Sequence, residues 1–210
     1  MRIDTLSTFP GMFDSVMGAS MMRLAQEKGL LDFRAHDLRD WTYDRHRTTD
    51  DDPYGGGDGL VMKCEPIFEA VEAIAAEGPA PCVVFMAPQG RRLDEALVRE
   101  MAAEQRLLFV CGHYEGIDER AYSLADRIVS LGDYVLTSGE LASMVAIDAV
   151  VRKIPGVLGA AAGADNESFG DGLLEYPQYT RPSVFRGMEV PPVLLSGDHG
   201  AVDRWRRQQQ

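Results

Sequence analysis

The stretch that decides the fold of this chain is Leu131-Gly-Asp-Tyr-Val-Leu-Thr-Ser-Gly-Glu-Leu141. It predicts a strand that runs into a tight turn at Ser138 and Gly139, where a helix begins. Glycines at 132 and 139 give the backbone conformations closed to other residues and let a ligand approach main-chain groups. Because an ordinary strand-to-helix connection has the same pattern, the stretch predicts a ligand site only together with other loops.

Apolar runs of strand length alternate with amphipathic segments of helix length along the chain. Residues 82–86 are apolar without interruption, which is typical of a parallel strand covered on both faces. The alternation predicts an α/β domain with a largely parallel sheet. We expect strands at residues 3–9, 30–38, 81–87 and 106–110, and helices at residues 12–28, 65–77, 93–103 and 141–151.

Loops at the carboxyl ends of parallel strands converge on one crevice, and here they are residues 88–90, residues 111–116 and the opening stretch. His113 and Glu115 are the groups in these loops best suited to chemistry. A zinc deaminase is excluded because its His-x-Glu motif needs a downstream Pro-Cys-x-x-Cys. A serine hydrolase is excluded because the Gly-x-Ser-x-Gly elbow is missing. Two interpretations of His113 stay open, a general base and a hydrogen-bonded structural residue.

The composition is that of an ordinary globular protein, with 45% apolar and 26% charged residues. No apolar run reaches membrane-spanning length and no signal-peptide pattern follows Met1, so we expect a cytoplasmic protein without a membrane partner. The formal net charge of −12 disfavours a non-specific nucleic-acid coat but allows a local basic groove. The 3 cysteines form no C-x-x-C pair, which predicts small buried thiols and neither a disulfide framework nor a zinc site.

Several segments depart from the α/β pattern. Residues 40–59 hold three consecutive aspartates and a run of glycines, which fits a ligand-binding loop or a solvated one, but not a P-loop. Residues 156–172 are rich in Gly and Ala and predict a flexible linker. Residues 173–182 mix aromatics, Arg and Pro, which suits contacts with RNA bases and phosphates or a rigid extended arm. Residues 198–210 predict the start of a basic helix.

The predicted helix at residues 141–151 is apolar on nearly every side. Such a helix is buried, and a partner subunit is one way to bury it, so homodimerisation would explain the pattern. Arg152 and Lys153 follow at the helix end, where cations are favoured, and Pro155-Gly156 stops the helix. For Arg152 this capping role is the simplest interpretation from the residues alone.

Five motifs, in one order, span almost the whole chain. They are Asp52-Pro-Tyr-Gly-Gly-Gly-Asp-Gly-Leu-Val-Met-Lys63, Cys111-Gly-His-Tyr-Glu-Gly-Ile-Asp-Glu-Arg120, Gly132-Asp-Tyr-Val-Leu-Thr-Ser-Gly-Glu-Leu141, Tyr176-Pro-Gln-Tyr-Thr-Arg-Pro182 and Val190-Pro-Pro-Val-Leu-Leu-Ser-Gly197. Together they resemble the bacterial tRNA (guanine-N1)-methyltransferases, the TrmD family of the SPOUT class. The resemblance implies methyl transfer from S-adenosyl-L-methionine (AdoMet) to N1 of the guanine immediately 3′ of the anticodon, position 37 of tRNA.

The same resemblance implies a SPOUT-type parallel sheet with a deep trefoil knot, an obligate homodimer and a small truncated C-terminal helical segment. It divides the chain into a knotted AdoMet-binding domain at residues 1–156, a flexible linker at 157–172 and a partial tRNA-binding domain at 173–210. A magnesium ion is a further family expectation, although the sequence shows no closed ligand set and no metal ligand is assigned. The implied AdoMet contacts are Phe85, Met86, Ala87, Pro88, Gly112, Tyr114, Glu115, Gly116, Leu131, Gly132, Tyr134, Leu136, Ser138 and Gly139.

Methyl transfer to guanine N1 requires that nitrogen to lose its proton, so a carboxylate base and a cation near O6 are chemically reasonable. By resemblance the base is Glu167, at a position where Asp is commoner, with Asp165 as a competitor. Arg152 matches the arginine that stabilises charge developing on the guanine.

The chain departs from the family pattern at three places. Ser138 stands where a second Gly is usual, and His113 where Arg is frequent. The chain also ends at Gln210, near the beginning of what is normally a longer C-terminal helical domain. The alternative function is therefore a catalytically impaired RNA- or AdoMet-binding protein of the same fold.

Overall fold

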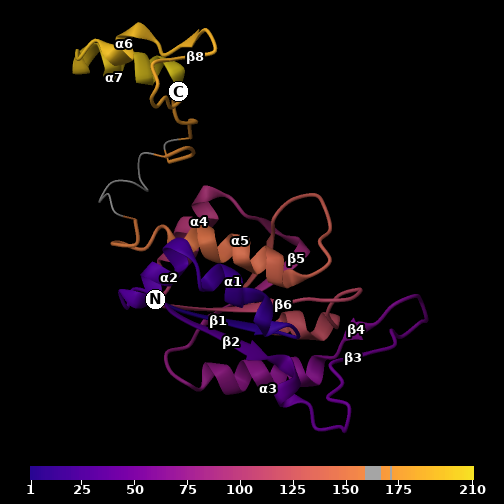
Figure 1. Ribbon diagram of the computed structural model, residues 1–210. Helices are drawn as coiled ribbons and strands as arrows, with labels where there is room; N and C mark the ends of the chain where they lie inside the picture. The colour runs from indigo at the N-terminus through magenta and orange to yellow at the C-terminus, as the bar shows by residue number, and fades with distance from the viewer. Residues whose placement is uncertain (159–166, 171) are drawn as a thin grey trace. The chain divides into compact units, whose positions relative to one another are not determined.

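The computed structural model describes residues 1–158, 167–170 and 172–210 (Figure 1). Its contacts divide the chain into two units, Met1–Gly159 and Ala160–Gln210. Among the described residues, no helix combines the length and the apolar character needed to cross a membrane.

Five parallel strands form the centre of the first unit, in the order β2-β1-β6-β5-β7. Their apolar residues explain the arrangement, because the central strand β6 is buried over its whole length. The α/β class with a parallel sheet is thus confirmed. The strands are β1 (Arg2–Ser7), β2 (Asp32–Asp37), β5 (Cys82–Arg92), β6 (Arg106–Cys111) and β7 (Arg127–Ser130).

Helices cover both faces of this sheet (Figure 1). One face packs against α1 (Asp14–Met17), α2 (Ser20–Glu27), α4 (Glu95–Ala102) and α5 (Gly139–Val151), and together they bury the larger apolar cluster. The other face packs against α3 (Cys64–Ala75), η2 (Leu38–Trp41) and η3 (Glu119–Leu124), which bury a second cluster. Two apolar layers on a central sheet are what the near-continuous apolar strands require.

The strand predicted within the opening stretch is wrong, because β7 ends at Ser130 and residues 131–138 form an irregular loop. Gly132 has a φ of +156°, outside the strand conformation. The Ser130 hydroxyl donates to Gly132 O at 3.3 Å and accepts from Gly132 N at 3.2 Å. The Ser130 hydroxyl thereby satisfies the N–H and C=O groups of Gly132, which in a strand would be hydrogen-bonded to the neighbouring strand.

Two further element boundaries differ from the prediction. The helix expected at residues 12–28 is broken at Gly18 and Ala19, and a 3₁₀ turn η1 (Pro10–Phe13) precedes its first part. The strand expected to end before Pro88 continues to Arg92, with a bulge between Met86 and Arg91. The extension passes very close to β7, since a Cβ atom on Gly90 would lie 2.5 Å from the backbone of Ile128.

The segment at residues 40–59 is partly ordered by a short antiparallel pair, β3 (Asp50–Asp51) and β4 (Val61–Met62). The cysteines are free, as predicted; Cys64 and Cys111 are buried and Cys82 is partly buried.

The second unit contains a hairpin of β8 (Val184–Phe185) and β9 (Met188–Glu189), followed by α6 (Pro192–Leu195) and α7 (His199–Gln209). Helix α7 is the predicted basic helix, and Asp198 caps it by accepting a hydrogen bond from Ala201 N at 3.0 Å. The Arg206 guanidinium lies 4.8 Å from the ring centre of Tyr176. Most of the predicted linker, residues 159–166 and 171, lies outside the described residues.

A buried charge network joins three strands at the amino-terminal edge of the sheet. Arg106, only 2% exposed, donates to Asp4 Oδ2 at 2.9 Å and to the carbonyls of Ile74 and Pro79 at 2.7 and 3.1 Å. Burial raises the pKa of Asp4, but hydrogen bonds with His36, Arg2 and Arg106 outweigh that effect and lower it to about 2. Asp4 is therefore an ionised carboxylate in the interior, held by its partners.

Replacing Arg106 by Met is expected to lower the free energy of unfolding by about 3–5 kcal/mol, because a buried carboxylate and two carbonyls lose their partner. Urea denaturation followed by circular dichroism measures the loss. The control is Arg34→Met, which removes an exposed guanidinium paired with Asp32 at 2.9 Å, and it should leave the urea midpoint nearly unchanged because solvent screens exposed ion pairs. Equal losses in the two variants would contradict the importance of the buried network.

Candidate functional site

The site begins where the first residue of α5 lies on the backbone at the end of β6. Gly139 N donates to Gly112 O at 2.7 Å. A Cβ atom on Gly139 would lie 2.6 Å from Gly112 N and 2.9 Å from Cys111 Cα, so only glycine allows this approach. The contact brings the loop at residues 131–138 next to the loop at residues 112–116. Ser138 has a φ of −158°, an extended conformation open to any residue, so serine is not strained there.

A pocket opens between these two loops and the bulged part of β5, with an empty volume of about 720 Å³ that includes its open mouth. It lies at the carboxyl edge of the sheet, where ligands bind in open α/β folds. Most of the residues predicted to contact the cofactor line it. They are Met86, Ala87, Pro88, Gly112, Tyr114, Glu115, Gly116, Leu131, Tyr134, Leu136, Ser138 and Gly139.

Two predicted residues do not line the pocket, and several lining residues were not predicted. The Phe85 side chain is fully buried behind the pocket, where its ring lies 5.1 Å from that of Tyr122. Gly132 shapes the turn after β7 without facing the cavity. Some of the unpredicted lining residues are sequence neighbours of predicted ones. Tyr122 on η3 and Ala142 on α5 are not, and no local sequence pattern marks them as lining residues. The lining residues outside the predicted contacts are His113, Ile117, Tyr122, Val129, Ser130, Val135, Thr137 and Ala142.

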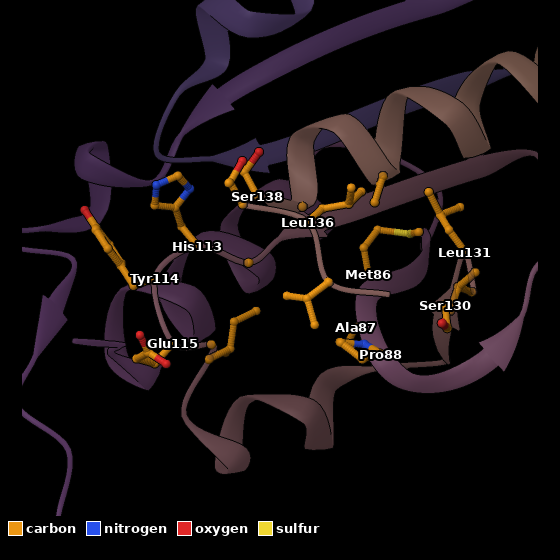
Figure 2. A pocket seen from close by; sticks show the side chains of 18 of the residues that line it. Met86, Ala87, Pro88, His113, Tyr114, Glu115, Ser130, Leu131, Leu136 and Ser138 are labelled. Atoms are coloured by element: carbon orange, nitrogen blue, oxygen red, sulfur yellow. The ribbon is translucent and has the colours of Figure 1, made fainter. Parts of the chain in front are cut away.

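Polar side chains gather at one end of the pocket (Figure 2). His113, Tyr114 and Glu115 lie there, while Ser130 and Leu131 lie at the other end. The His113 ring centre is 4.9 Å from that of Phe9 and 4.7 Å from that of Tyr114, so its orientation is held by aromatic contacts. Burial raises the pKa of the Tyr114 hydroxyl, and the nearby Asp50 carboxylate adds to the effect.

Two buried polar atoms of lining residues lack a hydrogen-bond partner within the described part of the chain. They are His113 Nδ1 and Ser138 Oγ. Buried polar atoms are normally paired, so a polar ligand in this pocket is one natural source of partners. Among the described lining residues, Glu115 carries the sole carboxylate. The described residues contain no group of three or more His, Cys, Asp or Glu side chains suited to a metal ion.

Of the predicted catalytic residues, Arg152 lies in the same unit as this pocket but away from it. Arg152 is the C-cap of α5, at the opposite end of the helix from Gly139 and about 20 Å away at 1.5 Å per residue. The neighbouring Lys153 pairs with Glu95 at 2.7 Å. Glu167 belongs to the second unit, and Asp165 is outside the described residues.

A parallel α/β sheet with a ligand-sized pocket at its carboxyl edge, lined by glycine-rich loops, defines the class of α/β ligand-binding domains. Comparisons with known proteins narrow this class. The model of the family described as tRNA (Guanine-1)-methyltransferase TrmD matches residues 1–210. The chain belongs to this family.

Named relatives agree over nearly the full chain. A tRNA (guanine-N(1)-)-methyltransferase of Geobacter sulfurreducens is 56% identical over 99% of this chain and 85% of its own length. One from Dehalococcoides mccartyi is 51% identical over 100% of this chain and 85% of its own length. The crystal structure of tRNA (m1G37) methyltransferase from Aquifex aeolicus superposes with a TM-score of 0.83 at 36% identity, covering 98% of this chain and 87% of that one.

Replacing Gly139 by Ala should destabilise the fold by about 1–3 kcal/mol, because the added methyl group meets backbone atoms that cannot move independently. Urea denaturation measures the change. Gly11→Ala is the control, since its Cβ atom would meet only Asp14 Oδ2, at an ordinary 3.8 Å, and the expected change is within about 0.5 kcal/mol. If Gly139→Ala unfolds at the same urea concentration as Gly11→Ala, the proposed close approach is wrong.

Proposed function

We propose that this chain is an AdoMet-dependent tRNA methyltransferase that forms 1-methylguanosine at position 37. The observation that carries the proposal is the family match over residues 1–210 together with a pocket lined by the motifs of that family. The relatives named above are tRNA (guanine-N1)-methyltransferases, and the solved structure is of an enzyme acting on guanine 37. No observation favours an impaired binding protein instead.

The pocket suits AdoMet. Its apolar walls fit an adenine ring, and glycines in the loops at residues 112–116 and 131–139 let a ligand approach the main chain closely. His113 Nδ1 and Ser138 Oγ offer buried polar atoms, and Glu115 offers a negative charge toward a cationic ligand. When bound, AdoMet supplies a methyl group carried on a positively charged sulfur.

We assign the proton-accepting role to Glu167, with Asp165 as the competing carboxylate. Removing the N1 proton leaves negative charge on the guanine, which the Arg152 guanidinium would stabilise near O6. A magnesium ion would take oxygen ligands, and Glu115 alone cannot complete such a site, so the substrate would have to supply most of them.

We also propose a homodimer. Leu141 and Val145 are exposed one turn apart on α5, and Phe9, Met12 and Val16 are exposed on and near η1, which contacts α5. An apolar surface of this kind is typical of a subunit interface. The separation of about 20 Å between Arg152 and Gly139 along α5 supports the same conclusion, because Arg152 can then act at the pocket of the partner subunit.

The remaining parts follow from the same family membership. We assign a trefoil knot to the carboxyl half of the first unit, which agrees with the passage of α5 directly over the end of β6. The second unit, with Tyr176 and Trp205 beside arginines of α7, is proposed to contact tRNA. Because its substrate would be tRNA, we propose that the protein is cytoplasmic.

The function is tested by incubating the protein with radiolabelled AdoMet and an unmodified tRNA transcript that has guanine at position 37. We expect label at N1 of that guanine, and a transcript with adenine at position 37 is the control. Glu167→Ala should lower the single-turnover rate by about 10²–10⁴-fold, as for loss of a general base. Full activity of Glu167→Ala with loss in Asp165→Ala would move the base to Asp165, and no transfer by the unaltered protein would exclude the enzyme.

Complementation tests the shared site. Arg152→Ala and Glu115→Ala should each be inactive alone, but co-expressed subunits should recover about one quarter of normal activity. Half of randomly assembled dimers are mixed, and each mixed dimer has one pocket with Glu115 and the partner's Arg152 intact. Equal expression is checked with distinct affinity tags. No recovery, or a monomer by light scattering, would contradict an arginine acting across the interface.

A further inference from the structure

Gly59 lies directly against the side chain of Glu115. A Cβ atom on residue 59 would lie 2.5 Å from Glu115 Cγ, 2.6 Å from Oε1 and 2.9 Å from Cδ, closer than Cβ contacts occur in proteins. Within the described part of the chain, the Glu115 carboxylate has neither a hydrogen bond nor an ion pair. The Glu115 side chain is exposed, and in this position it occupies the space that a Cβ atom on residue 59 would need.

The backbones on the two sides of this contact are tied together. Glu115 N donates to Leu60 O at 3.0 Å, Met62 N donates to Gly116 O at 2.9 Å, and Asp118 N donates to Met62 O at 2.9 Å. These bonds hold the segment that follows Gly59 on the loop that carries Glu115. A side chain added at residue 59 could not be relieved by moving the two segments apart without breaking them.

We propose that Gly59 is a positioning residue for the cofactor site, which leaves the space that the Glu115 side chain needs at the polar end of the pocket. This inference rests on the proposed role of Glu115 toward AdoMet. The atoms that a Cβ would meet belong to a flexible side chain and not to the backbone. The fold can therefore absorb an added methyl group by rotating Glu115, and the cost falls on ligand binding.

A matched pair of variants separates this effect from backbone strain. Gly59 and Gly56 lie in the same segment with φ of +84° and +77°, but a Cβ on Gly56 would have nothing within 4 Å. Alanine strains both positions alike. Titration calorimetry should show AdoMet affinity reduced at least about tenfold in Gly59→Ala and within about twofold in Gly56→Ala. Without AdoMet, the urea concentrations at which Gly59→Ala and Gly56→Ala unfold should be equal.

A double-mutant cycle with Glu115→Ala identifies the cause. In that background the three contacting atoms are gone, so Gly59→Ala should weaken AdoMet binding no further than Gly56→Ala does. If Gly59→Ala unfolds the protein, Gly59→Ala/Glu115→Ala should restore the midpoint of Gly56→Ala. An unchanged penalty in the Glu115→Ala background, or equal affinities of Gly59→Ala and Gly56→Ala, would overturn the inference. Normal AdoMet affinity of Glu115→Ala would instead refute the role proposed for Glu115.

Discussion

The site depends on one close approach, between the first residue of α5 and the backbone at the end of β6. Gly139 permits it because a side chain there would overlap Gly112 and Cys111. The approach determines where the irregular loop at residues 131–138 must run, since that loop has to connect the end of β7 to this point. The loop then lies beside residues 112–116, and these two segments both line one pocket.

The sheet was predictable where apolar runs are dense and unpredictable where they are short. Strands β1, β5 and β6 are predicted by their apolar stretches and by the helical segments between them. Strand β7 has four residues, begins with the partly exposed Arg127, and gives no periodic signal. The apolar residues 134–136 looked more strand-like, but Gly132 and the Ser130 hydroxyl end the strand before them.

The site was predictable to the extent that it is made of loops with a local glycine signal. Tyr122 and Ala142 enter the pocket because tertiary packing brings η3 and α5 to its walls, and no local pattern encodes that. The roles of Arg152 and Glu167 came from family resemblance alone. Neither could follow from the geometry of one pocket, because α5 carries Arg152 away from it and Glu167 belongs to a different unit.

One loop of the pocket holds its backbone at positive φ angles, which raise the free energy of a non-glycine residue. Tyr114 has a φ of +59° and Gly116 one of +134°, and a hydrogen bond of 3.2 Å from Gly116 N to His113 O closes the turn between them. Non-glycine residues in this region cost of order 1–3 kcal/mol, which the surrounding bonds must offset. A site formed by such fixed main-chain groups needs little reordering to bind a ligand. Two glycines limit the site in different ways, because a side chain at Gly139 would meet fixed backbone atoms, whereas one at Gly59 would meet the movable side chain of Glu115.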